Sequence, residues 1–167
     1  MEKKEGLTLI ELVIVMSIIA TMFLVSLPRF IQLGSSTRLE SEARKIAGML
    51  RYAYALSART ARFSRVNYDL DRGYYWVTLK NKQGIFVEAE DILAKRKKLP
   101  LQIEIEDIIF PEGRINSGVT YTEISPQGFV EETIIHLREV DSNHQLSLFT
   151  NPLTGEVTIY EGYKEKK

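Results

Sequence analysis

Glu11 is the residue whose position most needs a chemical explanation, because it lies near the start of an apolar run that continues to Leu27. As a helix of about 21 residues with a rise of ~1.5 Å each, the run is about 31 Å long, enough to cross a hydrocarbon core of ~30 Å. A carboxylate near the end of such a helix costs up to about 3.5 kcal/mol. The run therefore predicts one membrane-spanning helix, and Glu11 should either be neutralised or meet a cation.

The residues around Glu11 resemble the start of a type IV pilin or a type II secretion pseudopilin. Members of that superfamily have a short charged leader, a glycine, an apolar or aromatic first mature residue, Thr-Leu, an aliphatic residue, Glu and a long apolar run. Here the leader 1–6 ends at Gly6, and Leu7-Thr-Leu-Ile-Glu11 and the apolar run 12–27 follow it. Leu7 stands where phenylalanine is commoner.

This resemblance implies how the chain is processed and assembled. A prepilin peptidase would cut between Gly6 and Leu7, and Leu7 would become the N-methylated mature terminus. Glu11 would dock the subunit by pairing with the amino terminus of a neighbouring subunit in the growing filament. Pro28 falls where pilins commonly bend the helix, because proline removes a backbone hydrogen bond and clashes with the preceding turn.

The resemblance also implies partners and a location. The partners would be other major and minor pseudopilins or pilins, the prepilin peptidase/N-methyltransferase and the inner-membrane assembly platform. The chain would cross the inner membrane once, with its C-terminal head in the periplasm, and would join the pseudopilus. Sidedness rests on the resemblance, because Lys3 and Lys4 on the leader side are opposed by Arg29 and Arg38 on the other.

Two simpler explanations of the apolar run account for less of the sequence. A secretory signal peptide has a shorter apolar core, with a small-residue cleavage site after it. Here the small residue, Gly6, precedes the core. An ordinary signal anchor does not predict Glu11.

The length that remains after the leader and the membrane-spanning run suits one ordinary domain with its own core. The 167 residues include 22 basic and 22 acidic ones, so the formal net charge is zero and nothing draws the whole molecule to nucleic acid or acidic lipid. There is no cysteine, which excludes disulfides and thiolate metal sites. We expect a leader at 1–6, a transmembrane half-helix at 7–28, an amphipathic half-helix at 29–63, a β-rich head at 64–162 and a charged tail at 163–167.

The segment from Arg38 to Arg62 keeps a helical period. Its predicted buried stripe comprises Leu39, Ala43, Ile46, Ala47, Leu50, Ala53, Tyr54 and Ala61. Its predicted charged face comprises Arg38, Glu42, Lys45, Arg51, Arg59 and Arg62. This pattern indicates a helix that packs on a sheet by one side.

Short apolar or alternating runs follow, separated by turn residues. The expected strands are 65–70, 74–79, 85–88, a run around 101–105, 119–124, 129–137, 145–149 and 156–160. No crossover helices separate these strands, so a parallel sheet is excluded. We predict an α+β, type IV pilin-like fold, in which a long N-terminal helix packs on an antiparallel β-sheet or β-sandwich head.

The second half of the chain narrows the resemblance. The Ala/Arg-rich helix end 54–62 before Arg65-Val66, the turn Ile124-Ser-Pro-Gln-Gly128 and the closing Thr154-Gly155-Glu156-Val157 look like the GspH/FimT-type minor pseudopilins. Residues 80–118 carry little of this likeness.

The one charge run of this head is Lys95-Arg96-Lys97-Lys98. A basic cluster can bind phosphates through charge and counterion release, so these residues are a candidate contact for anions or DNA. A solvated loop or the edge of a short helix is the simpler interpretation. No aromatic residues interleave with the lysines, so a base-stacking platform is not indicated.

The sequence offers no persuasive catalytic or metal set, and we expect neither an enzyme nor a cofactor. His136 and His144 lie in an expected strand and an expected turn, outside any nucleophile motif. Asp69, Asp71 and Gly73 are similar to part of a calcium loop, but the regular acidic spacing is absent. Ser125 has no Gly-x-Ser-x-Gly setting.

The sequence thus predicts a minor pseudopilin of a type II secretion system, which promotes protein export across the outer membrane from the pseudopilus tip. The first alternative is a minor type IV pilin that acts in pilus assembly or in DNA uptake through the run 95–98. The second is a single-pass periplasmic enzyme or sensor whose leader motif is coincidental.

Overall fold

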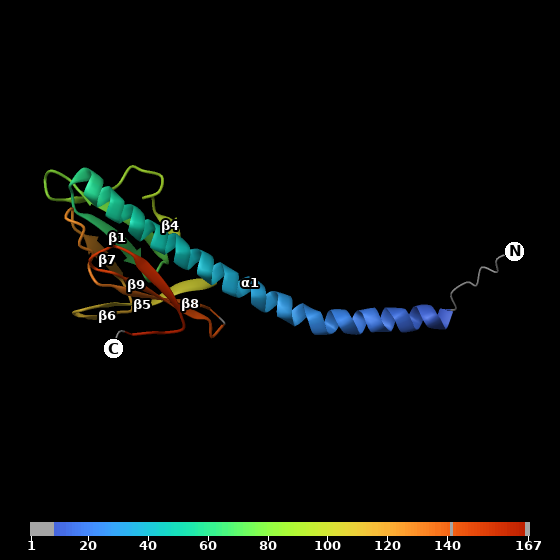
Figure 1. The fold of residues 1–167 in the computed structure, drawn as a ribbon. Coiled ribbons are helices and arrows are strands. Elements are labelled where there is room, and N and C mark those ends of the chain that lie inside the picture. The colour runs from blue at the N-terminus through green and yellow to red at the C-terminus, as the bar shows by residue number, and fades with distance from the viewer. Residues whose placement is uncertain (1–8, 141, 166–167) are drawn as a thin grey trace. The chain divides into compact units, whose positions relative to one another are not determined.

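In a computed structural model, one long helix precedes ten short strands within the part of the chain that is described (Figure 1). The structure describes residues 9–140 and 142–165, and for residues 24–37 it describes the helical backbone alone. Helix α1 comprises Leu9–Thr60. The chain forms two compact units, Met1–Thr37 and Arg38–Lys167, and each is described by itself.

The first unit is helical and apolar on its surface. Leu9 is 83% exposed, and apolar side chains from Ile10 to Phe23 are exposed as well. The two hydroxyls in this stretch bond within the helix, because Ser17 Oγ donates to the Val13 carbonyl at 2.7 Å and Thr21 Oγ1 donates to the Ser17 carbonyl at 2.5 Å. A helix with apolar side chains all round normally packs inside another apolar medium or assembly.

Three sequence predictions concern this unit and remain predictions. Gly6 and Leu7 lie outside the described residues. Pro28 lies in the stretch described by its backbone alone, where α1 is assigned without interruption, so the kink there is untested. Among the described residues, no helix is both long enough and apolar enough to cross a membrane.

The second half of α1 packs through the predicted stripe, whose buried members are Leu39, Ala43, Ile46, Ala47, Leu50 and Ala53. Two expectations for this half are wrong. Glu42 is only 6% exposed, and its Oε1 accepts a hydrogen bond from Lys45 Nζ at 2.6 Å. Ala61 is exposed beyond the helix with a φ of 53°, because α1 ends in a left-handed cap in which the Arg62 amide donates to the Ser57 carbonyl.

The strands form two antiparallel sheets, as predicted. The first sheet has the order β3-β2-β1-β7, with β4 also paired to β2. Its strands are β1 (Ser64–Asp69), β2 (Tyr74–Lys80), β3 (Phe86–Glu88), β4 (Lys97–Lys98) and β7 (Val119–Ile124). The second sheet has the order β10-β9-β8-β5-β6. Its strands are β5 (Ile103–Phe110), β6 (Gly113–Ile115), β8 (Ile134–Glu139), β9 (Gln145–Thr150) and β10 (Val157–Glu161).

Some predicted strand limits are corrected. The run around 101–105 starts later, because Leu101 lies in a turn and is 86% exposed. The expected strand 129–137 is divided: Val130 forms an isolated bridge with Ile124 of the first sheet, and β8 begins at Ile134 in the second. The chain therefore passes from one sheet to the other between these positions.

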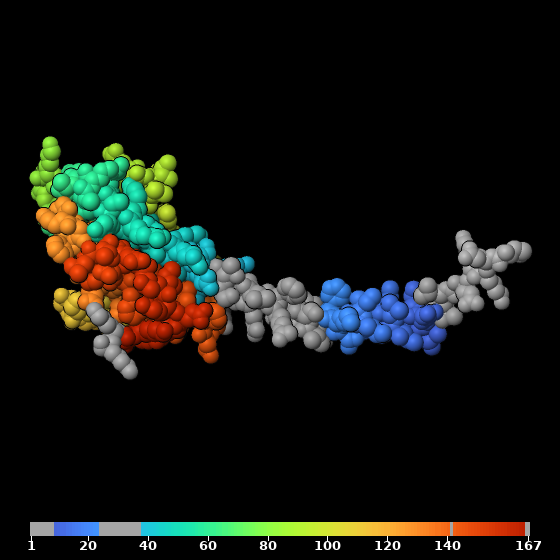
Figure 2. Space-filling view, in the orientation of Figure 1, coloured from blue at the N-terminus to red at the C-terminus, as the bar shows by residue number. Residues whose placement is uncertain are grey.

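One hydrophobic core joins the helix to both sheets. It includes Ile46 and Leu50 of α1, Val66 of β1, and Leu137 and Leu148 of β8 and β9. Full burial of each such side chain stabilises the fold by about 1.5–3 kcal/mol. The visible face of the space-filling view shows the C-terminal strands lying beside the second half of the helix (Figure 2).

Two turns close over one helical side chain, Tyr54. Gly128 and Gly155 have φ values of 90° and 65°, in the left-handed region that favours glycine. A Cβ on Gly128 would lie 2.9 Å from Tyr54 Oη, and one on Gly155 would lie 2.8 Å from Tyr54 Cε2. Both glycines belong to the closing segments that carry the sequence resemblance, and the close approach to Tyr54 explains why glycine is needed there.

Candidate functional site

Glu11 lies in the first turn of α1, as the sequence predicts for an acidic residue close to a helix start. Its side chain is exposed between the exposed apolar residues Ile10 and Leu12. The amino end of a helix carries a partial positive charge, which stabilises a carboxylate locally. Its docking role is a matter for proposal.

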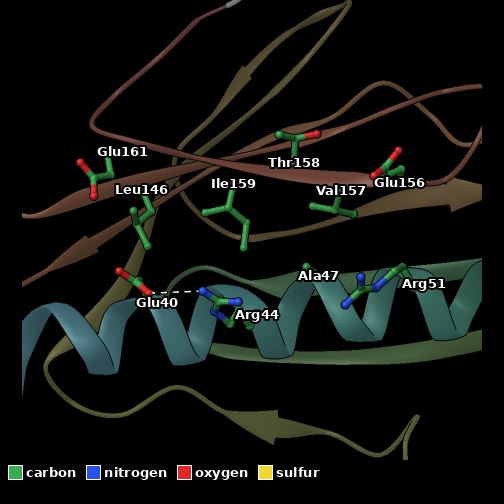
Figure 3. A pocket seen from close by; sticks show the side chains of 10 residues that line it. All are labelled: Glu40, Arg44, Ala47, Arg51, Leu146, Glu156, Val157, Thr158, Ile159 and Glu161. Carbon is green, nitrogen blue, oxygen red and sulfur yellow. Dashed lines mark hydrogen bonds and ion pairs between the residues drawn. The ribbon is translucent and has the colours of Figure 1, made fainter.

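A groove lies between the outer side of α1 and the edge strand β10 (Figure 3). Its helical wall consists of Glu40, Arg44, Ala47 and Arg51, which recur at the spacing of one helix face. Within this wall, Arg44 and Glu40 form an ion pair, with 3.5 Å between Arg44 Nη2 and Glu40 Oε2. Ala47 is buried between the two arginine positions, so its short side chain leaves room for a neighbour.

The opposite wall of the groove is the last strand of the second sheet. Val157 and Ile159 are half-buried and pack against the core, and Leu146 beneath them is buried. Glu156 and Glu161 are exposed and stand near the two ends of the groove (Figure 3). An apolar floor with a charged rim can hold an extended peptide.

The basic run 95–98 is not the free loop that the sequence predicts. Lys97 and Lys98 form β4, which pairs with Tyr75 and Tyr74 of β2. No aromatic residue interleaves with the lysines in the sequence, but the fold brings aromatic rings of β2 beside the run. The Arg96 guanidinium lies 4.1 Å from the ring centre of Trp76 and 5.2 Å from that of Tyr74, a cation–π arrangement. The aromatic rings come from β2, so no local sequence pattern could show this contact.

No protein-family model matches this chain, and no curated protein matches its sequence. Two solved structures of the minor pseudopilin EpsH, from the type II secretion system of Vibrio cholerae, are similar to it. One has a TM-score of 0.59 at 9% identity, covering 74% of this chain and 97% of EpsH. The other has a TM-score of 0.60 at 9% identity, covering 79% of this chain and 99% of EpsH. The chain has the minor-pseudopilin fold.

A second cation–aromatic group lies on this minor-pseudopilin fold, on the face of the first sheet turned away from the core. Arg65 lies between the rings of Phe86 and Tyr121, with 3.8 Å from its guanidinium carbon to each ring centre. Its Nη2 also lies 2.7 Å from Glu123 Oε2. Sequence reasoning missed this group, and its only local signal was the alternation of Arg65 with the buried Ser64 and Val66.

His136 belongs to a buried polar cluster that holds the C-terminal segment. A register shift between Ile105 and Asp107 places Asp107 opposite His136, as a bulge re-aims a side chain. His136 Nδ1 lies 2.5 Å from Asp107 Oδ1, and Nε2 lies 2.9 Å from the Lys164 carbonyl. Tyr163 stacks on the imidazole at 3.8 Å and donates its hydroxyl to Asp107 Oδ2 at 2.9 Å.

This cluster anchors the predicted charged tail through Tyr163, while Lys164 and Glu165 are exposed. The segment is fixed further by the Lys164 amide, which donates to Ser147 Oγ at 2.9 Å, and by an ion pair between Glu165 and Arg114. Both ring nitrogens of His136 are engaged and its side chain is fully buried, so the arrangement fits a structural clamp.

The remaining candidates have backbone partners. Asp69 Oδ1 accepts from the Arg72 amide and Asp71 Oδ1 accepts from the Gly118 amide, each at 3.0 Å. Ser125 Oγ accepts from the Phe129 amide at 3.1 Å, and His144 is exposed in a turn. Within the described residues, no group of three or more metal-binding side chains is present.

Proposed function

We propose that this chain is a minor pseudopilin of a type II secretion system. In this proposal a prepilin peptidase cuts between Gly6 and Leu7, Leu7 is N-methylated, and the mature subunit enters the pseudopilus tip to promote protein export across the outer membrane. The combination that supports it is a head with the minor-pseudopilin fold and, earlier in the sequence, the Gly6-to-Glu11 pattern.

The proposal gives each part of the chain a mechanical task. The apolar side chains of residues 9–23, exposed on the isolated helix, would be covered by the inner membrane before assembly and by neighbouring helices afterwards. Glu11 would pair with the methylated amino terminus of a neighbour. The head would stay in the periplasm and contact other minor subunits or secreted cargo, without catalysis or cofactor.

The basic run supports a second candidate, a minor type IV pilin that takes up DNA. Arg96 and Lys98 lie over Trp76 and Tyr74, and cations beside aromatic rings suit single-stranded nucleic acid. If this candidate holds, binding should weaken steeply as salt rises and should fall when Lys95, Arg96, Lys97 and Lys98 are neutralised. Absence of DNA binding by the full chain at low salt would remove it.

The proposal is tested by crosslinking the full chain in its host cell, followed by mass spectrometry of its amino terminus and its partners. Methyl-Leu7 crosslinked to secretion pseudopilins is the expected result. Methyl-Leu7 crosslinked to pilus subunits or DNA-uptake factors would favour the second candidate. An intact Met1 terminus without pilin-like partners would contradict both.

A further inference from the structure

We propose that β10 is an acceptor strand: an extended segment of a different neighbouring subunit, carrying at least one acidic side chain, adds to its open edge inside the groove beside α1. The neighbour is another subunit of the same filament, so the inference rests on the proposed function. It goes beyond that function by assigning the surface and the chemistry of the partner segment.

The backbone of β10 is arranged to accept a strand. The Asn151 amide donates to the Glu156 carbonyl and the Gly162 amide donates to the Gln145 carbonyl, each at 2.8 Å, so these even-numbered positions face β9. Successive residues of a strand direct their amide and carbonyl groups to opposite sides. Val157, Ile159 and Glu161 therefore direct theirs to the open edge, where no strand of the described chain pairs with β10.

Helix α1 lies beside this edge, so the edge strand forms one wall of a groove and the helix forms the other. A strand added beside β10 would continue the second sheet, with one face on the side of Val157 and Ile159. On that side the added strand would meet Ala47, whose short side chain leaves space between Arg44 and Arg51 (Figure 3). Apolar residues of the segment would pack on the floor, while its backbone would bond to the edge.

The charges of the helical wall determine which segment fits. Arg44 is 75% exposed and reaches only Glu40, at 3.5 Å. Arg51 is exposed, and it has no ion pair within the described residues. Glu156 and Glu161 stand near the two ends of the groove, so a carboxylate on the inner face of the added strand fits between them, where it would pair with Arg44 or Arg51.

The experiment places a photo-crosslinking amino acid at Thr158, which is exposed at the groove on the face of β10 turned away from α1, and maps the captured peptide by mass spectrometry in cells. The backbone contact is tested by a matched pair, Glu161→Pro and Glu161→Ala. Both remove the carboxylate, but only proline removes the amide that faces the edge, and an edge strand tolerates proline where that amide faces solvent. The charge contact is tested by Arg51→Glu against Arg59→Glu, an exposed cation of the same helix outside the groove.

We expect capture of one contiguous segment that contains Asp or Glu. Its yield should fall about tenfold, equivalent to about 1.4 kcal/mol, in Glu161→Pro and in Arg51→Glu. Glu161→Ala should not lower it, because alanine keeps the amide that faces the edge, and Arg59→Glu should leave it unchanged. Thermal unfolding of each full-length variant in detergent verifies that the head is intact.

Normal capture by Glu161→Pro, a captured segment without acidic residues, or capture of a second copy of this chain would overturn the acceptor-strand proposal. A second crosslinker at Val13 separates this failure from failure of the proposed function. If Val13 captures pilin-like subunits and Thr158 does not, only the acceptor strand is wrong. If neither position captures them, both proposals fall.

Discussion

Tyr54 connects three segments that are far apart in the sequence. Its ring lies under Gly128 and Gly155, and both glycines adopt positive φ values. The positive φ and the close approach to Tyr54 each disfavour a side chain at these positions, and both apply here. The fit of the Tyr54 ring against the two glycines thus holds the end of α1 to these two turns.

Gly155→Ala should lower the free energy of unfolding by about 2–4 kcal/mol, since alanine would be strained at this φ and its Cβ would collide with Tyr54. In a Tyr54→Ala background the same change should cost only about 1 kcal/mol, because the collision is gone and the backbone strain remains. Urea unfolding of the four proteins measures this coupling. Additive effects of the two substitutions would contradict the contact.

Glu131 has an unfavourable electrostatic position between the sheets. Desolvation raises its pKa above the usual value, and the carboxylates of Glu112 and Glu123 raise it further, while the bond from the Glu123 amide and the charge of Arg65 oppose the shift. The folded state therefore binds a proton more tightly than the unfolded chain at this residue, and stability is lost as the pH rises through the raised pKa.

Glu131→Gln should raise the melting temperature at neutral pH and flatten the decline above about pH 4.5, the ordinary glutamate pKa. Glutamine keeps an oxygen that accepts from the Glu123 amide, so the hydrogen bond is preserved. Melting curves of the wild type and the variant between pH 4 and pH 8 measure the difference. Parallel curves for the two proteins would show that Glu131 does not titrate in this range.

At the scale of elements, the C-terminal segment acts as a strap on the second sheet. Its residues provide a ring for stacking, a hydroxyl for Asp107 and a carbonyl for His136. His136 and Asp107 already bond each other, and the strap supplies a partner for the second polar atom of each, His136 Nε2 and Asp107 Oδ2. A buried polar atom without a partner is costly.

Tyr163→Phe should cost about 1 kcal/mol, because it removes one hydrogen bond and keeps the stacked ring, and Tyr163→Ala should cost about 2–3 kcal/mol. Hydrogen exchange at the Gly162 and Lys164 amides should quicken in the same order. Lys164→Ala is the matched control, because it keeps the carbonyl that His136 uses. Equal exchange in all four proteins would mean that the strap is not held by Tyr163.

Local periodicity explains which elements the sequence could predict. β7 lies at 119–124 as expected, because its alternating residues lie between clear turns. β4 and β6 have two and three residues, too few to show a period, and their pairing depends on neighbours distant in the chain. The sequence does not predict how the tail is anchored, because Tyr163 contacts Asp107 and His136, which belong to strands distant in the chain.

The candidate site was predicted unevenly for a similar reason. The Gly6-to-Glu11 pattern is contiguous, so it could be recognised by resemblance. The groove joins Arg44 and Arg51 to Glu161 across more than half of the chain, and no local pattern specifies that approach. The same applies to Arg96 over Trp76.

At the scale of the whole molecule, two surfaces of the described chain are the ones for which we propose partners. One is the apolar surface of residues 9–23 with Glu11, and the other is the edge of β10. Each lies in a different compact unit, so substitutions in the first should not disturb folding of the second.

Glu11→Ala should leave membrane insertion and the head's melting temperature unchanged while incorporation into filaments is abolished, because the partner's amino terminus loses its counter-charge. Fractionation of assembled and membrane-bound protein measures incorporation. Glu90→Ala, which removes an exposed carboxylate from the other unit outside the groove, is the control. Normal incorporation of Glu11→Ala would contradict docking through this carboxylate.

The packing of α1 against strands near the C-terminus also sets an order of events in folding. The stripe from Leu39 to Ala53 leaves the ribosome before any strand exists, yet its core partners include Leu137 and Leu148, which are synthesised near the end. Contacts between distant parts of a chain form slowly and leave apolar surface uncovered meanwhile. The apolar side of the helix in a newly made chain is therefore only partly covered until the last hairpin, β9–β10, has formed. This interval is when a chaperone would protect the chain.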